Sequence, residues 1–179
     1  MKTIKLETRD VEIKTSLSEI SLSEFEQCML IYTKEYKYAI DQYIEIIQVL
    51  SDLTVDEIES FEINEFEKLI NEIELNDFNS YVDVFKNEFI HQGITYKTKA
   101  TDTTFKFSVK EMFVIQDKLK SKSVDYVSTV AAILFNDVTV ITTEGIKTKQ
   151  EIFKDVMTMD YIAPYLIQLG QYYKVEVNA

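Results

Sequence analysis

The sequence contains very few of the residues that build disulfides, zinc sites or flexible linkers. Its one cysteine excludes a disulfide within the chain, and that cysteine with a single histidine cannot supply the ligands of a zinc site. One proline and three glycines leave no flexible linker, and the glycines stand alone, so no phosphate-binding loop is present. We therefore expect one continuous domain over residues 1–179, without a metal or a cofactor.

Membrane signals are lacking as well. No apolar run approaches the roughly 20 residues that span a bilayer. The N-terminus alternates apolar and polar residues, whereas a signal peptide has a continuous apolar stretch. These features predict synthesis in the cytoplasm and no membrane partner.

Residues with catalytic chemistry are equally scarce. A nucleophile activated by histidine would have to use His91, which lies beside a predicted glycine turn and is typical of a hydrogen-bonding loop residue. Cys28 falls on an amphipathic segment near Phe25 and Ile31, which indicates a small core residue rather than a reactive thiol. Catalysis by carboxylates alone would need a cleft that perturbs them. We therefore predict that the chain is not an enzyme.

Negative charge is abundant, and most of it lies in one part of the chain. From Glu45 to Ile90 there are 13 acidic residues and 2 basic ones, whereas from Lys97 to Lys122 there are 7 lysines and 3 acidic residues. An acidic surface repels phosphate backbones, so we expect no direct contact with nucleic acid. Two solvated faces would explain the same split, and so would two surfaces that bind partners.

Apolar residues recur at helical spacing through most of the chain, which predicts a mainly helical, single α+β domain. Three helix starts carry a serine or threonine followed three residues later by glutamate, at Ser21–Glu24, Thr54–Glu57 and Ser108–Glu111. Helices are expected over 21–34 and 39–50, from Thr54, from Asn64, and over 108–119, 124–135, 149–157 and 161–169. A helical subregion over 21–75 thus precedes a mixed subregion over 88–179.

Short strands are expected near the N-terminus and in the middle of the chain. Alternation over 1–15 predicts an N-terminal hairpin, and a second hairpin is expected around Gly93. Phe105 and Phe107 indicate a possible third strand. The β-branched run over 138–143 indicates a strand or extended loop that ends at Glu144–Gly145. Alternation from Tyr173 onward indicates a possible C-terminal strand.

Tyrosines are concentrated in two places. Four crowd one helix junction and four crowd the C-terminus: Tyr32, Tyr36, Tyr38 and Tyr43, and Tyr161, Tyr165, Tyr172 and Tyr173. Tyrosine combines buried area with a polar tip and is favoured at interfaces. The edge of a core would explain these residues equally well, and some can serve both purposes.

Three segments carry a family resemblance: 46–54 followed by the acidic helix near Asn64, the hairpin around Gly93 that leads into the helix at Ser108, and 126–135. In this order, over about 22–173, they resemble small helical proteins encoded among the tail, baseplate and neck genes of large tailed bacteriophages, including baseplate-hub assembly proteins. The terminal strands lie outside the resemblance and leave open a neck ring or an internal protein.

The resemblance implies a structural or assembly protein of the particle. It would bind other phage structural proteins and copies of itself, in the host cytoplasm during assembly and then in the virion. The charge split predicts the residues that meet a partner: Glu65, Glu67, Glu72, Glu74, Lys110, Lys118, Lys120 and Lys122. The alternative is a cytosolic, acidic, chaperone-like or inhibitory module that holds a basic partner and is absent from the finished particle.

Overall fold

Local capping signals begin three of the helices. The hydroxyl groups of Ser21, Thr54 and Ser108 each accept a hydrogen bond from the backbone N–H three residues on, at 3.2–3.3 Å. The structure, a computed structural model, describes residues 1–73, 75, 80, 84–100, 105–121, 123–135 and 143–173. Its helices are α1 (Leu22–Thr33), α2 (Ala39–Leu50), α3 (Val55–Glu59), α4 (Ile63–Asn71), α5 (Val109–Ser121), α6 (Tyr126–Leu134), α7 (Thr143–Val156), the 3₁₀ turn η2 (Met159–Tyr161) and α8 (Ala163–Tyr173).

Two antiparallel hairpins complete the described part of the fold. β1 (Lys2–Lys5) pairs with β2 (Asp10–Ile13), and β3 (Glu88–His91) pairs with β4 (Ile94–Lys97). The second hairpin turns through Gln92 at φ 49° and Gly93 at φ 77°. Positive φ at both central positions is the geometry of a type I′ hairpin turn, and glycine adopts it without strain. The expected α+β, mainly helical fold with two short hairpins is therefore confirmed.

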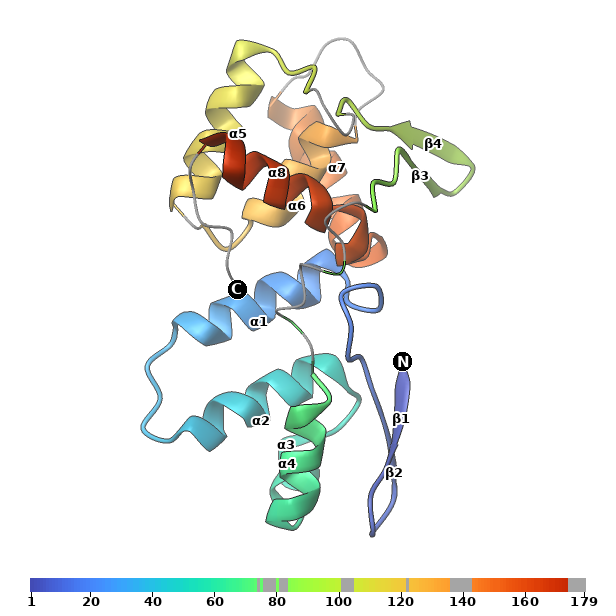
Figure 1. Cartoon of the computed structure of the whole chain (residues 1–179), viewed down its shortest axis with the longest axis vertical. Helices are drawn as coiled ribbons and strands as arrows, with labels where there is room; N and C mark the ends of the chain where they lie inside the picture. The colour runs from blue at the N-terminus through green and yellow to red at the C-terminus, as the bar shows by residue number, and fades with distance from the viewer. Residues whose placement is uncertain are drawn as a thin grey trace.

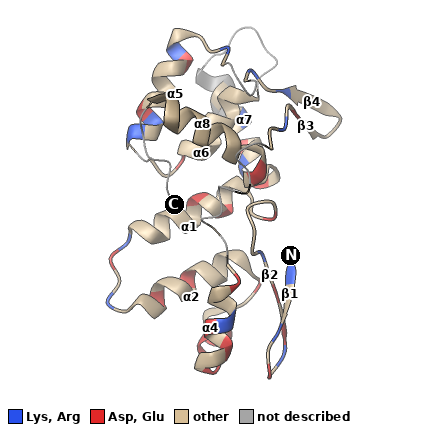
Figure 2. Cartoon of the chain, in the orientation of Figure 1, with Lys and Arg blue, Asp and Glu red and all other residues tan. Residues whose placement is uncertain are grey.

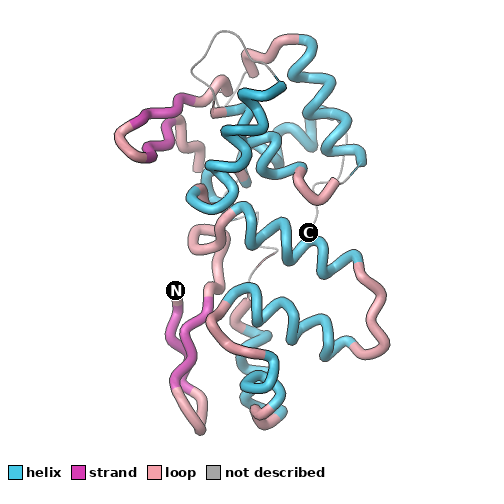
Figure 3. Tube along the Cα trace, turned by 180° about the vertical axis from the view of Figure 1, so that it is seen from behind, coloured by secondary structure: helices cyan, strands magenta, loops and turns pink. Residues whose placement is uncertain are grey.

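The elements form two ends with α1 between them. Both views place β1–β2 and α2–α4 at one end and α5–α8 with the β3–β4 hairpin at the other (Figures 1 and 3). Backbone hydrogen bonds from Leu22 N–H to Met157 and from Met159 N–H to Ile20 join the start of α1 to the connection after α7. In the described part of the chain, no helix is both long and apolar enough to cross a membrane.

The core of the C-terminal end is built around α6, which is buried along its whole length. Aromatic contacts attach the β3–β4 hairpin to this core. The Phe153 ring of α7 lies 5.4 Å from that of Phe89 and 5.0 Å from that of Tyr96, and Phe89 also packs at 5.3 Å against Tyr161. Two strands alone are only marginally stable. These inward-facing rings therefore stabilise the β3–β4 hairpin.

Two predicted helix limits were wrong. α7 begins at Thr143, so Glu144–Gly145 lies inside it and does not end a strand. α8 continues through Gly170 to Tyr173. A single glycine in a helix costs only about 1 kcal/mol. The buried side chains of Phe153 on α7 and of Tyr165 and Leu169 on α8 outweigh that cost.

The structure contradicts some of the remaining strand predictions, and the others fall on residues that it does not describe. Phe105 makes one isolated bridge to Ala100, and no strand forms there. Tyr173 is helical, so it does not begin a strand. The run 136–142 and the residues 174–179 lie outside the described residues.

Candidate protein-docking site

The single cysteine and the single histidine both contribute to packing. Burial raises the pKa of the Cys28 thiol to about 12, so it stays protonated at neutral pH. The His91 imidazole stacks on the Phe89 ring, with centroids 6.3 Å apart. Among the described residues, no group of three or more His, Cys, Asp or Glu side chains could hold a metal ion. The site of interest is instead apolar.

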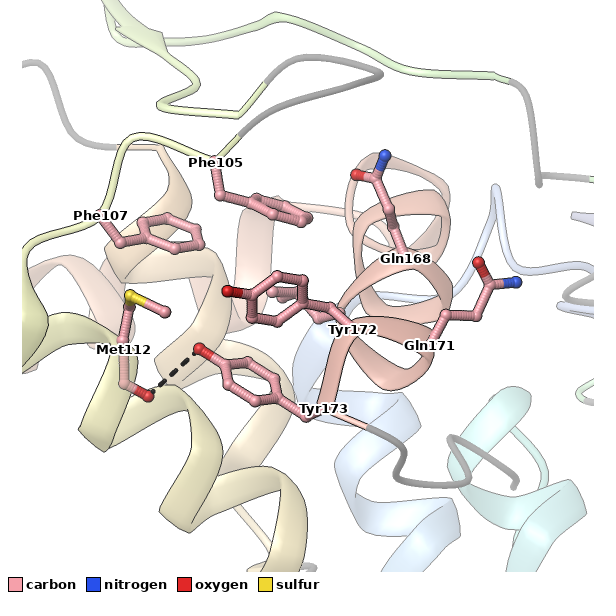
Figure 4. A pocket seen from close by; sticks show the side chains of 8 residues that line it. Phe105, Phe107, Met112, Gln168, Gln171, Tyr172 and Tyr173 are labelled. Carbon is pink, nitrogen blue, oxygen red and sulfur yellow. Dashed lines mark hydrogen bonds between the residues drawn. The ribbon is translucent and has the colours of Figure 1, made fainter.

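A groove of about 570 Å³ lies between the beginning of α5 and the end of α8 (Figure 4). We call it the aromatic groove. Its walls carry four rings and a thioether, from Phe105, Phe107, Met112, Tyr172 and Tyr173. The rings of Phe105 and Phe107 stack with centroids 5.2 Å apart, and Tyr173 Oη donates a hydrogen bond to the Met112 carbonyl at 3.5 Å.

Hydrogen bonds to Glu111 hold in place the wall of the aromatic groove that lies at the beginning of α5. The Glu111 carboxylate accepts from the Ser108 backbone N–H at 2.7 Å and from Lys99 Nζ at 2.7 Å. Burial alone would raise the pKa of Glu111, but the bonds from Lys99 and Ser108 outweigh it and lower the pKa below the usual range. The carboxylate is therefore ionised near neutral pH and ties the start of α5 to the segment before Phe105 and Phe107.

Helix α5 has two apolar faces, and one of them points to solvent. Ile115 and Leu119, four residues apart, are buried in the core. Val109 and Phe113, also four residues apart, lie on a different face and are 70% and 67% exposed. Tyr172 at the end of α8 is 62% exposed. Beside the groove residue Met112, α5 therefore presents an exposed apolar face, which a helix that only covers a core does not need.

The charges around the aromatic groove are positive. Lys106 and Lys110 are exposed and make no ion pair within the described chain. Glu111, next to Lys110, is buried and paired, whereas Asp117 further along α5 is exposed, and α8 carries no charged residue. In Figure 2, α5 carries lysines together with acidic positions, and further acidic positions lie on α2 and α4 at the far end.

The predicted lysines fall into three groups. Lys110 and Lys120 are exposed on α5. Lys118 is half-buried, and its Nζ lies 2.7 Å from Asp125 Oδ1. Burial would raise the pKa of Asp125, but hydrogen bonds from Lys118, Gln150 and Ser123 lower it to about 2. Lys118 is thus occupied inside the chain, and Lys122 lies outside the described residues.

The four predicted glutamates also differ in their surroundings. Glu67 is exposed on α4, whereas Glu72 forms an ion pair with Lys2. Glu74 lies outside the described residues. The interpretation of Glu65 as a solvated, partner-facing residue was wrong, because its side chain is 4% exposed. Helical spacing could not reveal that the N-terminal hairpin covers this part of α4.

Glu65 connects α4 to the turn of the first hairpin. Its Oε1 accepts hydrogen bonds from the Thr8 backbone N–H at 3.0 Å and from Thr8 Oγ1 at 3.1 Å. The Thr8 N–H is the main reason that the pKa of Glu65 lies below its usual range. The stabilisation is present above the usual pKa of glutamate and is lost as the pH falls through the lowered value.

We expect Glu65→Ala to lower the melting temperature by a few degrees at neutral pH, because the Thr8 N–H loses its acceptor. Glu67→Ala is the matched control on the exposed face of the same helix and should leave the melting temperature unchanged. Thermal unfolding followed by circular dichroism measures both. Equal melting temperatures for the two variants would show that the Glu65 contact adds no stability.

Sequence reasoning found only part of this site. It identified the tyrosines at the C-terminus, assigned Phe105 and Phe107 to a strand, and did not single out Met112 or Phe113. The sequence pattern that could have revealed this surface is the pair Val109 and Phe113. The pair forms a second apolar stripe on α5, in addition to the core stripe of Ile115 and Leu119.

Comparison with known proteins identifies no family for the chain. No protein-family model matches the sequence, and no curated protein and no solved structure matches the chain.

Proposed function

We propose that this chain is a structural or assembly protein of a tailed-phage particle and that it acts by binding other proteins through the aromatic groove. The observation that carries the binding role is the second apolar face of α5, where Val109 and Phe113 are exposed beside the groove. The order of segments over 22–173, which resembles phage tail, baseplate and neck proteins, supports the setting.

The composition of the surface favours a protein partner. Phenylalanine, tyrosine and methionine are enriched at protein interfaces, and the groove contains all three. Its volume would also suit a small molecule, since such pockets measure roughly 300–1,000 Å³. Val109 and Phe113 on α5 do not line the groove, however, and a small ligand inside it would leave both in water. A partner with a side chain for the groove and a surface for α5 covers both.

We expect Phe113→Asp to reduce the amount of the protein in purified particles at least about tenfold, because a central aromatic contact contributes about 2 kcal/mol or more. The side chain is exposed, so the fold and the helical circular dichroism signal should be unchanged. Mass spectrometry of purified particles measures incorporation. Val124→Asp, at an exposed apolar position in the turn before α6, is the control and should be incorporated normally.

Two outcomes would count against this function. If the wild-type chain is absent from particles, the phage structural role is wrong, and the acidic chaperone-like module becomes the better explanation. If Phe113→Asp enters particles as well as Val124→Asp does, the exposed α5 face beside the groove is not the binding surface.

A further inference from the structure

An exposed isoleucine lies among carboxylates at the end of the molecule opposite the aromatic groove. Ile63, the first residue of α4, is 63% exposed. Glu59 at the end of α3, Glu62 beside Ile63, and Glu67 one turn further along α4 are exposed as well. None of these three carboxylates forms an ion pair within the described chain. We call these four residues the acidic knob.

The acidic knob and the aromatic groove match in chemistry. The knob presents one aliphatic side chain with three carboxylates. The groove presents mainly apolar walls, and the exposed Lys106 and Lys110 adjoin its lining residues in the sequence. Burying Ile63 against aromatic walls would remove apolar surface of both from water. The lysines and glutamates would then meet at the rim, where charge sets orientation and association rate.

One chain cannot bring the two surfaces together. The knob lies on α3 and α4, and the groove lies between α5 and α8 at the other end, with α1 between the two ends (Figures 1 and 2). A second copy of the chain can supply the missing half of the contact.

We propose that the acidic knob of one copy docks into the aromatic groove of the next copy, an inference that rests on the proposed function and names the chain itself as a partner. Since the knob and the groove lie at opposite ends of the chain, the contact can run head-to-tail from copy to copy. Each added copy leaves one knob and one groove available, and repetition therefore gives a ring if the rotation closes or a filament if it does not.

Two exposed substitutions test the contact by complementation. Ile63→Asp disables the knob and leaves the groove unchanged. Phe113→Asp places a carboxylate on the exposed α5 face beside the groove, where it repels the carboxylates of the knob, and leaves the knob unchanged. Each variant alone should be monomeric at 20.9 kDa by light scattering. An equimolar mixture should form a species of twice that mass and no larger, because one intact knob meets one intact groove. A wild-type species larger than two copies distinguishes this head-to-tail contact from a two-fold dimer, which would satisfy both knobs and both grooves and stop at two copies.

The charges supply a second test that leaves the apolar residues in place. Glu67→Lys and Lys110→Glu should each weaken self-association by up to about fivefold, as expected for exposed ion pairs. The chain with both changes should recover the wild-type affinity. Wild-type association should be stronger at about 0.05 M than at about 0.5 M salt, since salt screens exposed charges.

The outcomes separate this inference from the proposed function. A wild-type chain that oligomerises while the mixture stays monomeric would overturn knob-to-groove docking. A wild-type chain that stays monomeric at low salt would overturn self-association. In either case, loss of Phe113→Asp from particles would still support binding of another protein in the groove, and its retention would reject that function too.

Discussion

Replacing Phe153 with alanine should lower the free energy of unfolding by about 3–5 kcal/mol. The ring is fully buried on α7 and packs against Phe89 and Tyr96, which attach the β3–β4 hairpin to the helices. The substitution removes apolar burial and leaves a cavity among rings that belong to different elements. Urea denaturation followed by circular dichroism would measure the change.

Phe113→Ala provides a matched control for that result. It removes the same side chain from an exposed position on α5, so the free energy of unfolding should change by no more than about 0.5 kcal/mol. A loss at Phe153 as small as the loss at Phe113 would show that the hairpin is not held by this aromatic cluster.

Glu26→Leu should cost about 1–3 kcal/mol of stability, because it leaves a buried backbone donor without an acceptor. Glu26 lies on α1 and is 4% exposed. Its Oε1 accepts the Ser128 N–H in the first turn of α6 at 2.8 Å, and its Oε2 lies 3.8 Å from Lys154 Nζ of α7. One carboxylate therefore connects three helices. Gln27→Leu, at the exposed neighbouring position, is the control and should change stability little.

The pH dependence of stability gives a separate test of Glu26. Burial raises the pKa of this carboxyl, and the Ser128 hydrogen bonds and Lys154 oppose the shift only in part. The protonated form is favoured in the folded chain, so its contribution is complete below the usual pKa of 4.5 and is lost as the pH rises through the raised value.

Glu26→Gln keeps an acceptor for the Ser128 N–H and cannot ionise. We therefore expect its stability relative to the wild type to improve as the pH rises from about 4.5 to 7. Urea denaturation at several pH values measures the free energy of unfolding of both proteins. The contributions of the other carboxylates are the same in both and cancel in the difference. A difference that stays constant or declines with pH would contradict the raised pKa.

Local signals in the sequence were sufficient for most elements. The serine or threonine hydroxyl and the following glutamate placed the starts of α1, α3 and α5, because both partners lie within four residues. The hairpin around Gly93 was also confirmed, since its turn depends on two adjacent residues. Such signals act before any distant segment is in place.

Predictions failed where a distant segment decided the outcome. Gly145 and Gly170 were interpreted as ends of elements, but packing of α7 and α8 carries both helices through them. Glu65 was assigned to solvent, but the turn of the first hairpin supplies Thr8 and covers it. At the two glycines the local preference against helix amounted to about 1 kcal/mol, and helix packing outweighed it. At Glu65 the deciding contact comes from a residue 57 positions away.

The sequence by itself determined the helical character of this chain, its two hairpins and its separation into an acidic and a basic part. The apolar spacing, capping residues and charges that set these features are local or additive. Only the tertiary structure brought Phe105 and Phe107 against Tyr172 and Tyr173 and left Val109 and Phe113 exposed. A groove between segments some 60 residues apart depends on how the helices pack, and no local pattern encodes that packing.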